Sequence, residues 1–552
     1  MEAPMRKTLH AAHTVTAAKP TGIGAKLAGT APEGELLSAK PSQHSNHPCI
    51  EKMLPTGVAL ALEMRRATLL HSLRERFAAL CAEGGVQAPP MNAFERWRFL
   101  GCWSEQRRSC ESPSHLRCLA PDSDALFPSG AACAAEALGR TDALPERVAT
   151  KQVRRDESTP GSAFEWMVYD LRRSGVSETG AQHIAEALGH ASDGARAAIR
   201  QLSSELLERS EAMRYVESAR AADAVLVLSV RTLPDGAEPD FVTVTVSEAS
   251  LAKLRTLFRH TMGAEPSAAA DGPLNTSSRL ATTKKKRRRS VEVRKRPRCG
   301  EGSAAGCVPP SELSESAFLA RAFTLLLRYQ SIGGAGFHAS IGPTVHRALR
   351  ATLGVDFECC ASPLNCYHTA YCSAFADVDA PFGSSGSFAA FAPTTGAFEV
   401  NPPFAPGMID AVCAHVLRSL AAAQQASQAL TMVLVLPGWL DSAGWKLVER
   451  SAFLRRQLLV AAADHGFVDG AQYMRRYSFR QSPYDTTLFF CQTDAAAAAT
   501  PLSEGAVKRI EASLAACTPT EEMLRKVPQS ELVERGAKQR RNRKKRLRES
   551  NA

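Results

Sequence analysis

The sequence predicts an α/β fold with a mainly parallel sheet, preceded by a mostly helical domain. In the second half of the 552 residues, apolar runs with the length of strands alternate with helical patterns, an order that produces a parallel sheet. In the first half, apolar residues recur at the helical period. Aperiodic segments rich in Ala, Pro, Gly, Ser or basic residues separate and flank the two halves, and such composition indicates disorder.

These changes of pattern divide the chain into five segments. They are a disordered N-terminal segment (1–54), a helical domain with a β-hairpin (55–262), a disordered basic insertion (263–312), the α/β core (313–494) and a basic C-terminal tail (495–552). The formal net charge of +11 favours a polyanionic partner such as RNA or DNA. Much of that charge sits in the runs 284–298 and 538–548, which also resemble nuclear-import signals, so we expect a nuclear protein.

Cysteine spacing and hydropathy argue against several classes of protein. The 15 cysteines are scattered without zinc-ribbon spacing, so we expect no metal site. The start, Met1–Pro4, lacks the apolar core of a secretory signal, and we therefore expect reduced thiols inside a cell. No apolar run reaches the length of a membrane span, so we expect no membrane partner.

In the helical domain, the first helix is expected to begin at Val58 and to end before Pro89-Pro90, because proline interrupts helical hydrogen bonding. Asn92 is the expected N-cap of a second helix. A period of two over Ala224–Val230 and Phe241–Val246 predicts the β-hairpin. Further helices are expected at Ala131–Leu138, Ala163–Arg173, Glu178–Leu188, Ser192–Ala221 and Glu248–His260.

The α/β core begins with an apolar helix from Ser316. Strands are expected at Phe357–Ala361, Ser387–Phe391, Phe398–Val400, Met432–Leu436 and Thr487–Cys491. Helices are expected at Thr344–Leu353, Pro406–Gln425 and Ala443–Ala463. Because ligands of such sheets lie at the carboxyl ends of the strands, the loops that follow the strands are the candidate binding loops.

The most informative of these loops is Asn401-Pro402-Pro403-Phe404, which follows the strand that ends at Val400. Two prolines form a stiff turn with free carbonyls. The side-chain oxygen of Asn401 and the carbonyl of Pro402 can both accept hydrogen bonds from one exocyclic amine. Phe404 offers a face on which a planar ring can stack. This arrangement suits a nucleobase amine that receives a methyl group, although the tetrapeptide is also a common turn former.

Three further loops carry small or polar residues that would form a nucleoside-type cofactor pocket. Ser362-Pro363-Leu364-Asn365 permits close approach to the backbone, but it lacks the glycines of a dinucleotide fingerprint. Asp377 or Asp379 would accept hydrogen bonds from ribose or amine groups, the alternative being an exposed acidic loop. Phe382-Gly383-Ser384 is the third loop, and Asn401 completes the pocket.

No nucleophile-and-base pair stands out. Ser362 and Ser384 lack a G-x-S-x-G context, and His368, His415 and His465 belong to no motif. This absence agrees with methyl transfer, since an adenine amine needs alignment with an electrophilic methyl group more than it needs a base or a metal.

The stretch Phe357–Tyr367 resembles the phosphorylated-CTD-interacting factor family, whose members are cap-specific adenosine N6-methyltransferases of messenger RNA. The likeness extends weakly back to Leu60. It continues through Tyr371–Phe375, Phe382–Ser384, Phe391–Pro393, Phe398–Phe404, Pro437–Trp439 and Ser451–Leu458. The resemblance implies a Rossmann-like methyltransferase core, S-adenosyl-L-methionine as methyl donor, and capped mRNA with 2′-O-methyladenosine next to the 7-methylguanosine cap as substrate.

The resemblance also implies site residues. The Asn401–Phe404 turn would hold the target adenine, Arg66 and Arg96 would contact the substrate, and Trp439 would line the cap groove by stacking on the cationic base. A solvated helix face is the alternative for the two arginines, and core packing is the alternative for Trp439.

The sequence departs from the family at several places. Animal members carry an N-terminal WW domain, whereas residues 1–54 contain no tryptophan, which counts against the RNA polymerase II machinery as a partner. Ala405-Pro406 stands where family members place an acidic residue, and the loop Leu440–Ala443 also differs. Two other functions stay open: an adenine-N6 methyltransferase of DNA or internal RNA sites, and a non-catalytic RNA-binding adaptor with a methyltransferase-like fold.

Overall fold

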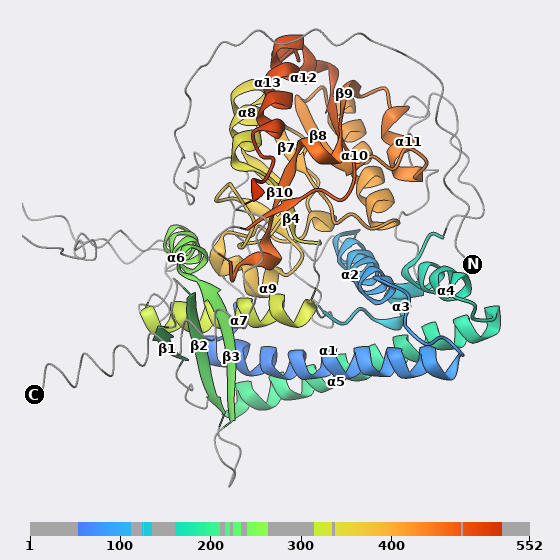
Figure 1. Ribbon diagram of the computed structural model, residues 1–552, viewed down its shortest axis with the longest axis vertical. Coiled ribbons are helices and arrows are strands. Elements are labelled where there is room, and N and C mark those ends of the chain that lie inside the picture. Colours follow the sequence, from blue (N-terminus) through green and yellow to red (C-terminus); the bar gives the residue numbers. More distant parts are fainter. Residues whose placement is uncertain are drawn as a thin grey trace, which may run out of the picture. The chain divides into compact units, whose positions relative to one another are not determined.

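Six strands of the C-terminal half form one mixed sheet in a computed structural model of the chain (Figure 1). The structure describes residues 53–111, 124, 126–134, 160–209, 216–220, 225–232, 240–262, 314–333, 337–475 and 478–521. These residues belong to one compact unit, Leu36–Ala552. The expectations for residues 1–52, for the insertion 263–312 and for the tail after residue 521 lie outside the described residues.

The main sheet has the strand order β6-β5-β7-β8-β12-β9. Its strands are β5 (Phe357–Ala361), β6 (Tyr371–Ser373), β7 (Gly396–Val400), β8 (Leu430–Pro437), β9 (Leu454–Val460) and β12 (Thr486–Gln492). Strands β6, β5, β7 and β8 run parallel, whereas β12 pairs antiparallel with both β8 and β9. The carboxyl ends of the four parallel strands therefore meet at one edge, as the sequence predicts.

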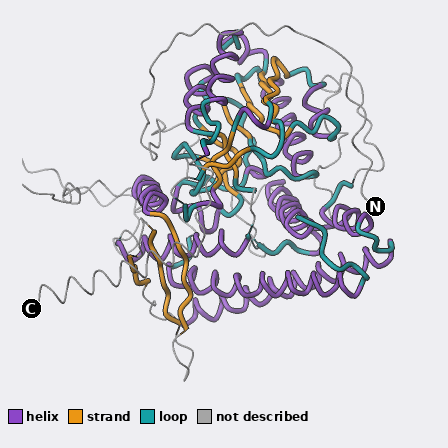
Figure 2. The backbone as a smooth tube through the Cα atoms, in the orientation of Figure 1, coloured by secondary structure: helices purple, strands orange, loops and turns teal. Residues whose placement is uncertain are grey.

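Helices cover both faces of this sheet. Met432, Leu434 and Leu436 of β8 belong to one apolar core, and Val433 and Val435 belong to a second, because successive side chains of a strand point to opposite faces. Helix α10 (Met408–Gln425) packs into the first core, and α8 (Pro343–Leu353) and α13 (Glu504–Ala515) pack into the second. Figure 2 shows these helices around the strands. Strand β8 is buried along its whole length, which explains its continuous apolar sequence.

Shorter elements complete this half. They are β4 (Ala339–Ile341), α9 (Ala376–Asp379), η4 (Ala380–Phe382), η5 (Phe388–Ala390), α11 (Ala443–Glu449), η6 (Ala462–Asp464), β10 (Gly466–Asp469), η7 (Gly470–Gln472), β11 (Phe479–Gln481) and α12 (Asp494–Ala499). Strands β11, β10 and β4 form a small sheet in that order. Pairing of β4 with β10 fixes the backbone just after His338.

The N-terminal half is mostly helical. Its elements are α1 (Thr56–Glu83), α2 (Ala93–Glu111), α3 (Gly130–Ala134), α4 (Ala163–Arg173), α5 (Glu178–Arg209), β1 (Val216–Arg220), β2 (Val225–Thr232), β3 (Asp240–Ser247) and α6 (Glu248–Met262). The expected hairpin is present as the antiparallel pair β2–β3, with β1 added on the other side of β2. Helix α7 (Glu315–Ile332) packs against α1 and so joins the two halves.

One expected helix boundary is wrong. In place of the predicted helices 178–188 and 192–221, the structure has one helix, α5, which ends at Arg209. Residues 216–220 form strand β1. Ser192 is buried inside this helix instead of capping one, since its Oγ donates a hydrogen bond to the Pro128 carbonyl at 2.7 Å.

Two expectations in the α/β core are also wrong. Residues 387–391 form the short 3-10 turn η5 instead of a strand, because the Ser387 side chain caps it by accepting a hydrogen bond from the Ala389 N–H. The predicted helix 443–463 ends at Glu449, and its second part becomes β9. Pairing with β12 along the edge of the sheet overrides the local helical pattern there.

Among the described residues, no helix has the length and apolarity needed to cross a membrane. In the same part of the chain, no group of three or more His, Cys, Asp or Glu side chains is arranged to hold a metal ion.

Candidate functional site

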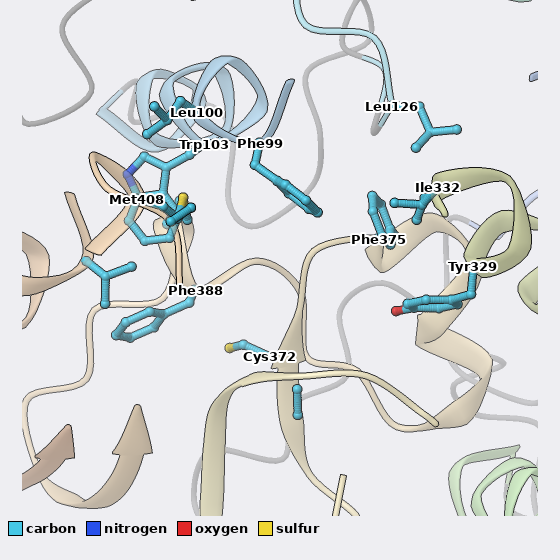
Figure 3. Close-up of a cluster of buried hydrophobic side chains, with 14 of the residues drawn as sticks. Phe99, Leu100, Trp103, Leu126, Tyr329, Ile332, Cys372, Phe375, Phe388 and Met408 are labelled. Atoms are coloured by element: carbon cyan, nitrogen blue, oxygen red, sulfur yellow. The ribbon is translucent and has the colours of Figure 1, made fainter. Parts of the chain in front are cut away.

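A cavity lies at the carboxyl ends of β5, β6 and β7. The space between its walls is about 810 Å³, a figure that includes open solvent at its mouth. The loops that follow these strands contribute Ser362, Ala374 and Asn401, and helix α2 supplies the opposite wall with Phe99 and Trp103. Figure 3 shows these two rings directed from α2 toward the aromatic residues of the α/β half. The cavity is thus aromatic on its walls and polar at the strand ends.

The turn Ser362–Asn365 is closed by its own side chains. The Asn365 Oδ1 accepts hydrogen bonds from the Ser362 N–H at 2.7 Å and from the Ser362 Oγ at 2.9 Å. The Asn365 Nδ2 donates to the carbonyl of His338 at 2.7 Å. Ser362 and Asn365 line the cavity, whereas Pro363 does not. This network holds the backbone of the turn rigidly at the end of β5.

Asn401 presents a buried acceptor at the end of β7. Its Nδ2 donates to the Ala339 carbonyl at 3.2 Å, which fixes the orientation of the amide. Its Oδ1 is buried and has no hydrogen-bond partner in the described structure. A buried polar atom without a partner costs about 1–3 kcal/mol, so such atoms concentrate where a ligand supplies the missing bond. Asn401 lines the cavity, and Oδ1 is therefore its best candidate ligand contact.

The other three residues of the tetrapeptide do not all lie at the cavity. Pro403 lines the cavity, but Pro402 and Phe404 do not. The Phe404 ring packs edge-on against Phe467, with centroids 5.8 Å apart, and belongs to the core under α8 and α13. Stacking of Phe404 on a base therefore stays a prediction.

The sequence reasoning missed most of the lining residues, and His338 and Trp103 are two of those. His338 is buried, its Nε2 has no hydrogen-bond partner, and burial lowers its pKa to about 4, so the ring is neutral at pH 7. Trp103 packs edge-on against Phe388, 6.2 Å away. The helical spacing of Phe99 and Trp103 could have indicated that both lie on one helix face, but core residues show the same spacing. No sequence pattern marks His338 as a lining residue.

Asp377 forms ion pairs and does not line the cavity. Arg328 bonds both of its carboxylate oxygens, at 3.0 and 2.8 Å, and Arg66 lies 3.7 Å away. Burial opposes ionisation of Asp377, but Arg328 and Arg66 outweigh it and hold its pKa below the usual value. Arg328 also forms two 2.6 Å bonds to Glu63. The group ties α1, α7 and α9 together.

Asp379 stands behind the cavity wall. Its Oδ2 accepts a 2.8 Å hydrogen bond from the hydroxyl of Tyr329, a lining residue. Burial raises the pKa of Asp379 to about 7, against the opposing effect of that hydrogen bond.

The loop Phe382–Ser384 also supports the wall from behind. Gly383 has a φ of 104°, and a Cβ there would lie 2.5 Å from the Thr369 carbonyl, so only glycine fits. Ser384 shares a 2.7 Å hydrogen bond with Ser373, which lines the cavity. Phe382 is fully buried.

The three residues expected to contact the substrate lie apart from the cavity lining. Arg66 forms an ion pair with Asp124 at 2.9 Å. Arg96 forms one with Asp170 at 3.0 Å, and its guanidinium lies 5.0 Å from the centre of the Trp166 ring. Trp439 is partly exposed and packs edge-on against Tyr484 at 5.3 Å.

Comparison with known proteins finds a matching family model within the α/β half of the chain. Residues 310–470 match the family described as "Phosphorylated CTD interacting factor 1 WW domain". Although that description names a WW domain, the matched residues fold as the α/β sheet and its helices. They include every cavity-lining residue from Tyr329 to Met408.

Two curated relatives share the name "mRNA (2'-O-methyladenosine-N(6)-)-methyltransferase". The human protein is 38% identical over 187 residues, which cover 32% of this chain and 26% of the relative. The mouse protein is 36% identical over 196 residues, which cover 34% of this chain and 27% of the relative. The chain thus spans about a quarter of the length of these curated relatives.

Proposed function

Residues 310–470 match the phosphorylated CTD interacting factor 1 family model, and from this match we propose that the chain methylates the adenine N6 of 2′-O-methyladenosine next to the cap of mRNA. S-adenosyl-L-methionine would be the methyl donor. The name that the human and mouse relatives share supports methyl transfer to this adenine nitrogen. The observation that carries the proposal is the buried, unpartnered Oδ1 of Asn401 at the end of β7.

The residues of the cavity fit an adenosyl donor. Aromatic walls accommodate a planar base, and the unpartnered Nε2 of His338 can bond to its polar edge. Ser362, Asn365 and Asn401 would hold the donor at the strand ends. Pro363, Asp377, Phe382, Gly383 and Ser384 would act by fixing the backbone and walls behind it. When bound, S-adenosylmethionine supplies an electrophilic methyl group.

Asn401 would orient the acceptor amine. Because the bond to the Ala339 carbonyl holds the amide, Oδ1 is already positioned and needs no reorganisation to accept a hydrogen bond from N6. The carbonyl of Pro402 would accept the second amine hydrogen. Two such bonds favour a tetrahedral nitrogen with its lone pair available for attack, which stabilises the transition state more than the ground state.

Substrate contacts outside the cavity belong to the same proposal. Arg66 and Arg96 would exchange their present carboxylate partners for RNA, and the partly exposed ring of Trp439 would stack on the methylated guanine. A nuclear location follows from the basic runs 284–298 and 538–548.

The test measures transfer of a labelled methyl group from S-adenosylmethionine to capped RNA that begins with 2′-O-methyladenosine. The protein should methylate this RNA, and Asn401→Ala should lower kcat by about 100-fold or more, as loss of one transition-state hydrogen bond does in other enzymes. Leu440→Ala, an exposed change outside the cavity, serves as the control and should leave kcat unchanged.

Three outcomes separate the alternatives. Equal transfer to capped and uncapped RNA would favour an enzyme of internal RNA sites or DNA. Absence of both transfer and donor binding would favour the RNA-binding adaptor. Equal rates for the wild-type protein and Asn401→Ala would contradict the role given to the amide.

A further inference from the structure

One wall of the cavity comes from outside the α/β half. Phe99, Cys102, Trp103 and Gln106 all line it, and their spacing of three, one and three residues places them on a single face of α2. Helix α2 precedes the family-matched segment 310–470 by some 200 residues of sequence. The α/β half alone therefore leaves the cavity without this wall.

Helix α2 is fixed in place by both polar and aromatic contacts. The Gln106 Oε1 accepts a 2.5 Å hydrogen bond from the Ser387 hydroxyl. The Trp103 ring lies edge-on to His415, with centroids 5.9 Å apart. The Phe99 ring lies 5.8 Å from Phe337 and 6.5 Å from Phe375. These contacts position the wall before any ligand binds, which lowers the entropy cost of binding.

The chemistry of the wall fits a planar heterocycle. Figure 3 shows Phe99 and Trp103 on one side, with Phe375 and Phe388 across from them. Phe99 and Trp103 are each less than a tenth exposed, so their rings are largely withdrawn from water. A flat, uncharged base lying against such rings gains offset or edge-to-face contacts and excludes water, whereas a sugar or a phosphate would lose its hydration there.

We propose that Phe99 and Trp103 of helix α2 bind the adenine ring of the methyl donor, so that the donor site is shared between the helical domain and the α/β half. This inference rests on the proposed function, because it takes the cavity as the donor site. The two residues are specificity-determining contacts for the base, while the strand-end loops hold the remainder of the ligand.

The test uses S-adenosylhomocysteine, the demethylated form of the donor, so that binding is measured without turnover. Titration of the full chain should change tryptophan emission, because Trp103 is one of five tryptophans and the one in the cavity lining. Trp103→Phe keeps an aromatic wall and should remove most of that change, while calorimetry shows an affinity within about threefold of wild type. Trp166→Phe, on α4 outside the lining, is the matched control and should keep the emission change.

Affinity then tests the wall itself. Phe99→Leu and Trp103→Leu keep apolar volume but lose a ring, and each should weaken S-adenosylhomocysteine binding about tenfold, which corresponds to about 1.4 kcal/mol. The inference is overturned if the wild-type chain binds S-adenosylhomocysteine, both leucine variants bind as tightly, and Trp103→Phe keeps the emission change; the proposed function then stands. If the wild-type chain binds no S-adenosylhomocysteine, both this inference and the proposed function are contradicted. Should a leucine variant misfold, the Trp103→Phe emission result decides.

Discussion

A neutral imidazole stands in the cavity wall at His338. Burial lowers its pKa to about 4 from the ordinary 6.5, and the carbonyl of the same residue accepts hydrogen bonds from Asn365 and Gly470. The backbone is thus held on both sides, while the ring Nε2 has no partner in the described structure. Because the ring stays neutral between pH 6 and 8, His338 can either donate or accept a hydrogen bond over that range.

The low pKa of His338 makes stability depend on pH in a definite direction. Above pH 6.5 the folded and unfolded states both hold a neutral ring, and the contribution of His338 is fully present. As the pH falls from 6.5 through about 4, the unfolded chain binds a proton that the folded chain excludes, and stability is lost. His338→Gln should remove this loss, on the order of 1–3 kcal/mol.

Urea unfolding at pH 7 and at pH 4.5 measures this effect. The midpoint of the wild-type protein should fall further than that of His338→Gln. Other buried histidines, His346, His368, His415 and His465, also have lowered pKa values and titrate in both proteins, so the difference between the proteins carries the information. The exposed change His71→Gln is the control. Parallel pH profiles for His338→Gln and wild type would contradict the account.

At the scale of elements, Arg328 joins three helices. It is fully buried and bonds Glu63 of α1 and Asp377 of α9 with both guanidinium edges. Replacing Arg328 by Met leaves two carboxylates without their main cation, and loss of one partner from a buried ion pair costs about 3–5 kcal/mol. Arg328→Met should therefore lower the free energy of unfolding by about this amount.

The pair Arg255–Glu315, in which Arg255 is partly exposed and Glu315 is exposed, offers the comparison. The same change, Arg255→Met, should alter the free energy of unfolding by less than about 1 kcal/mol, because water screens a surface pair. Denaturant unfolding of both variants gives the two values. The account of Arg328 fails if the two arginine-to-methionine changes cost the same.

Elements that depend on local chemistry were predictable from the sequence. Helix α4 has the predicted bounds, because Ser162 and Glu165 form a reciprocal capping box at its start. Strand β9 was not predictable, since its partner β12 lies 26 or more residues away along the chain and pairing overrides the helical pattern. The long helix α5 was divided wrongly at Ser192, whose hydroxyl finds a tertiary partner in Pro128.

The candidate site follows the same division. Ser362, Asn365, Asn401 and Pro403 line the cavity, and they lie at strand ends that alternation alone could place. The aromatic wall could not be placed, because it depends on how α2 packs against η5 and α10. For Asp377, the sequence predicts its position after a strand. Its ion pair with Arg328 arises from tertiary packing and could not be predicted.

At the scale of the whole molecule, the proposed donor cavity and the basic runs occupy different parts of the chain. Every residue that lines the cavity falls between Phe99 and Met408 and is described by the structure. The basic runs 284–298 and 538–548 fall outside the described residues. A polyanion contacts basic side chains through phosphate charge, with little demand for a fixed pocket. Changes in the basic runs should therefore affect RNA binding without affecting donor binding.

Replacing the six residues Lys284–Arg289 by glutamine tests this separation. Each phosphate contact to single-stranded RNA contributes about 0.7 to the slope of log K against log salt, so the slope should fall by up to about 4. Calorimetry of S-adenosylhomocysteine binding should give the wild-type affinity, because no cavity-lining residue is changed. Fluorescence anisotropy of a capped oligonucleotide at salt concentrations between about 50 and 200 mM measures the slope. An unchanged slope would mean that this run contacts no phosphate, and the RNA affinity would then have to come from the folded surface.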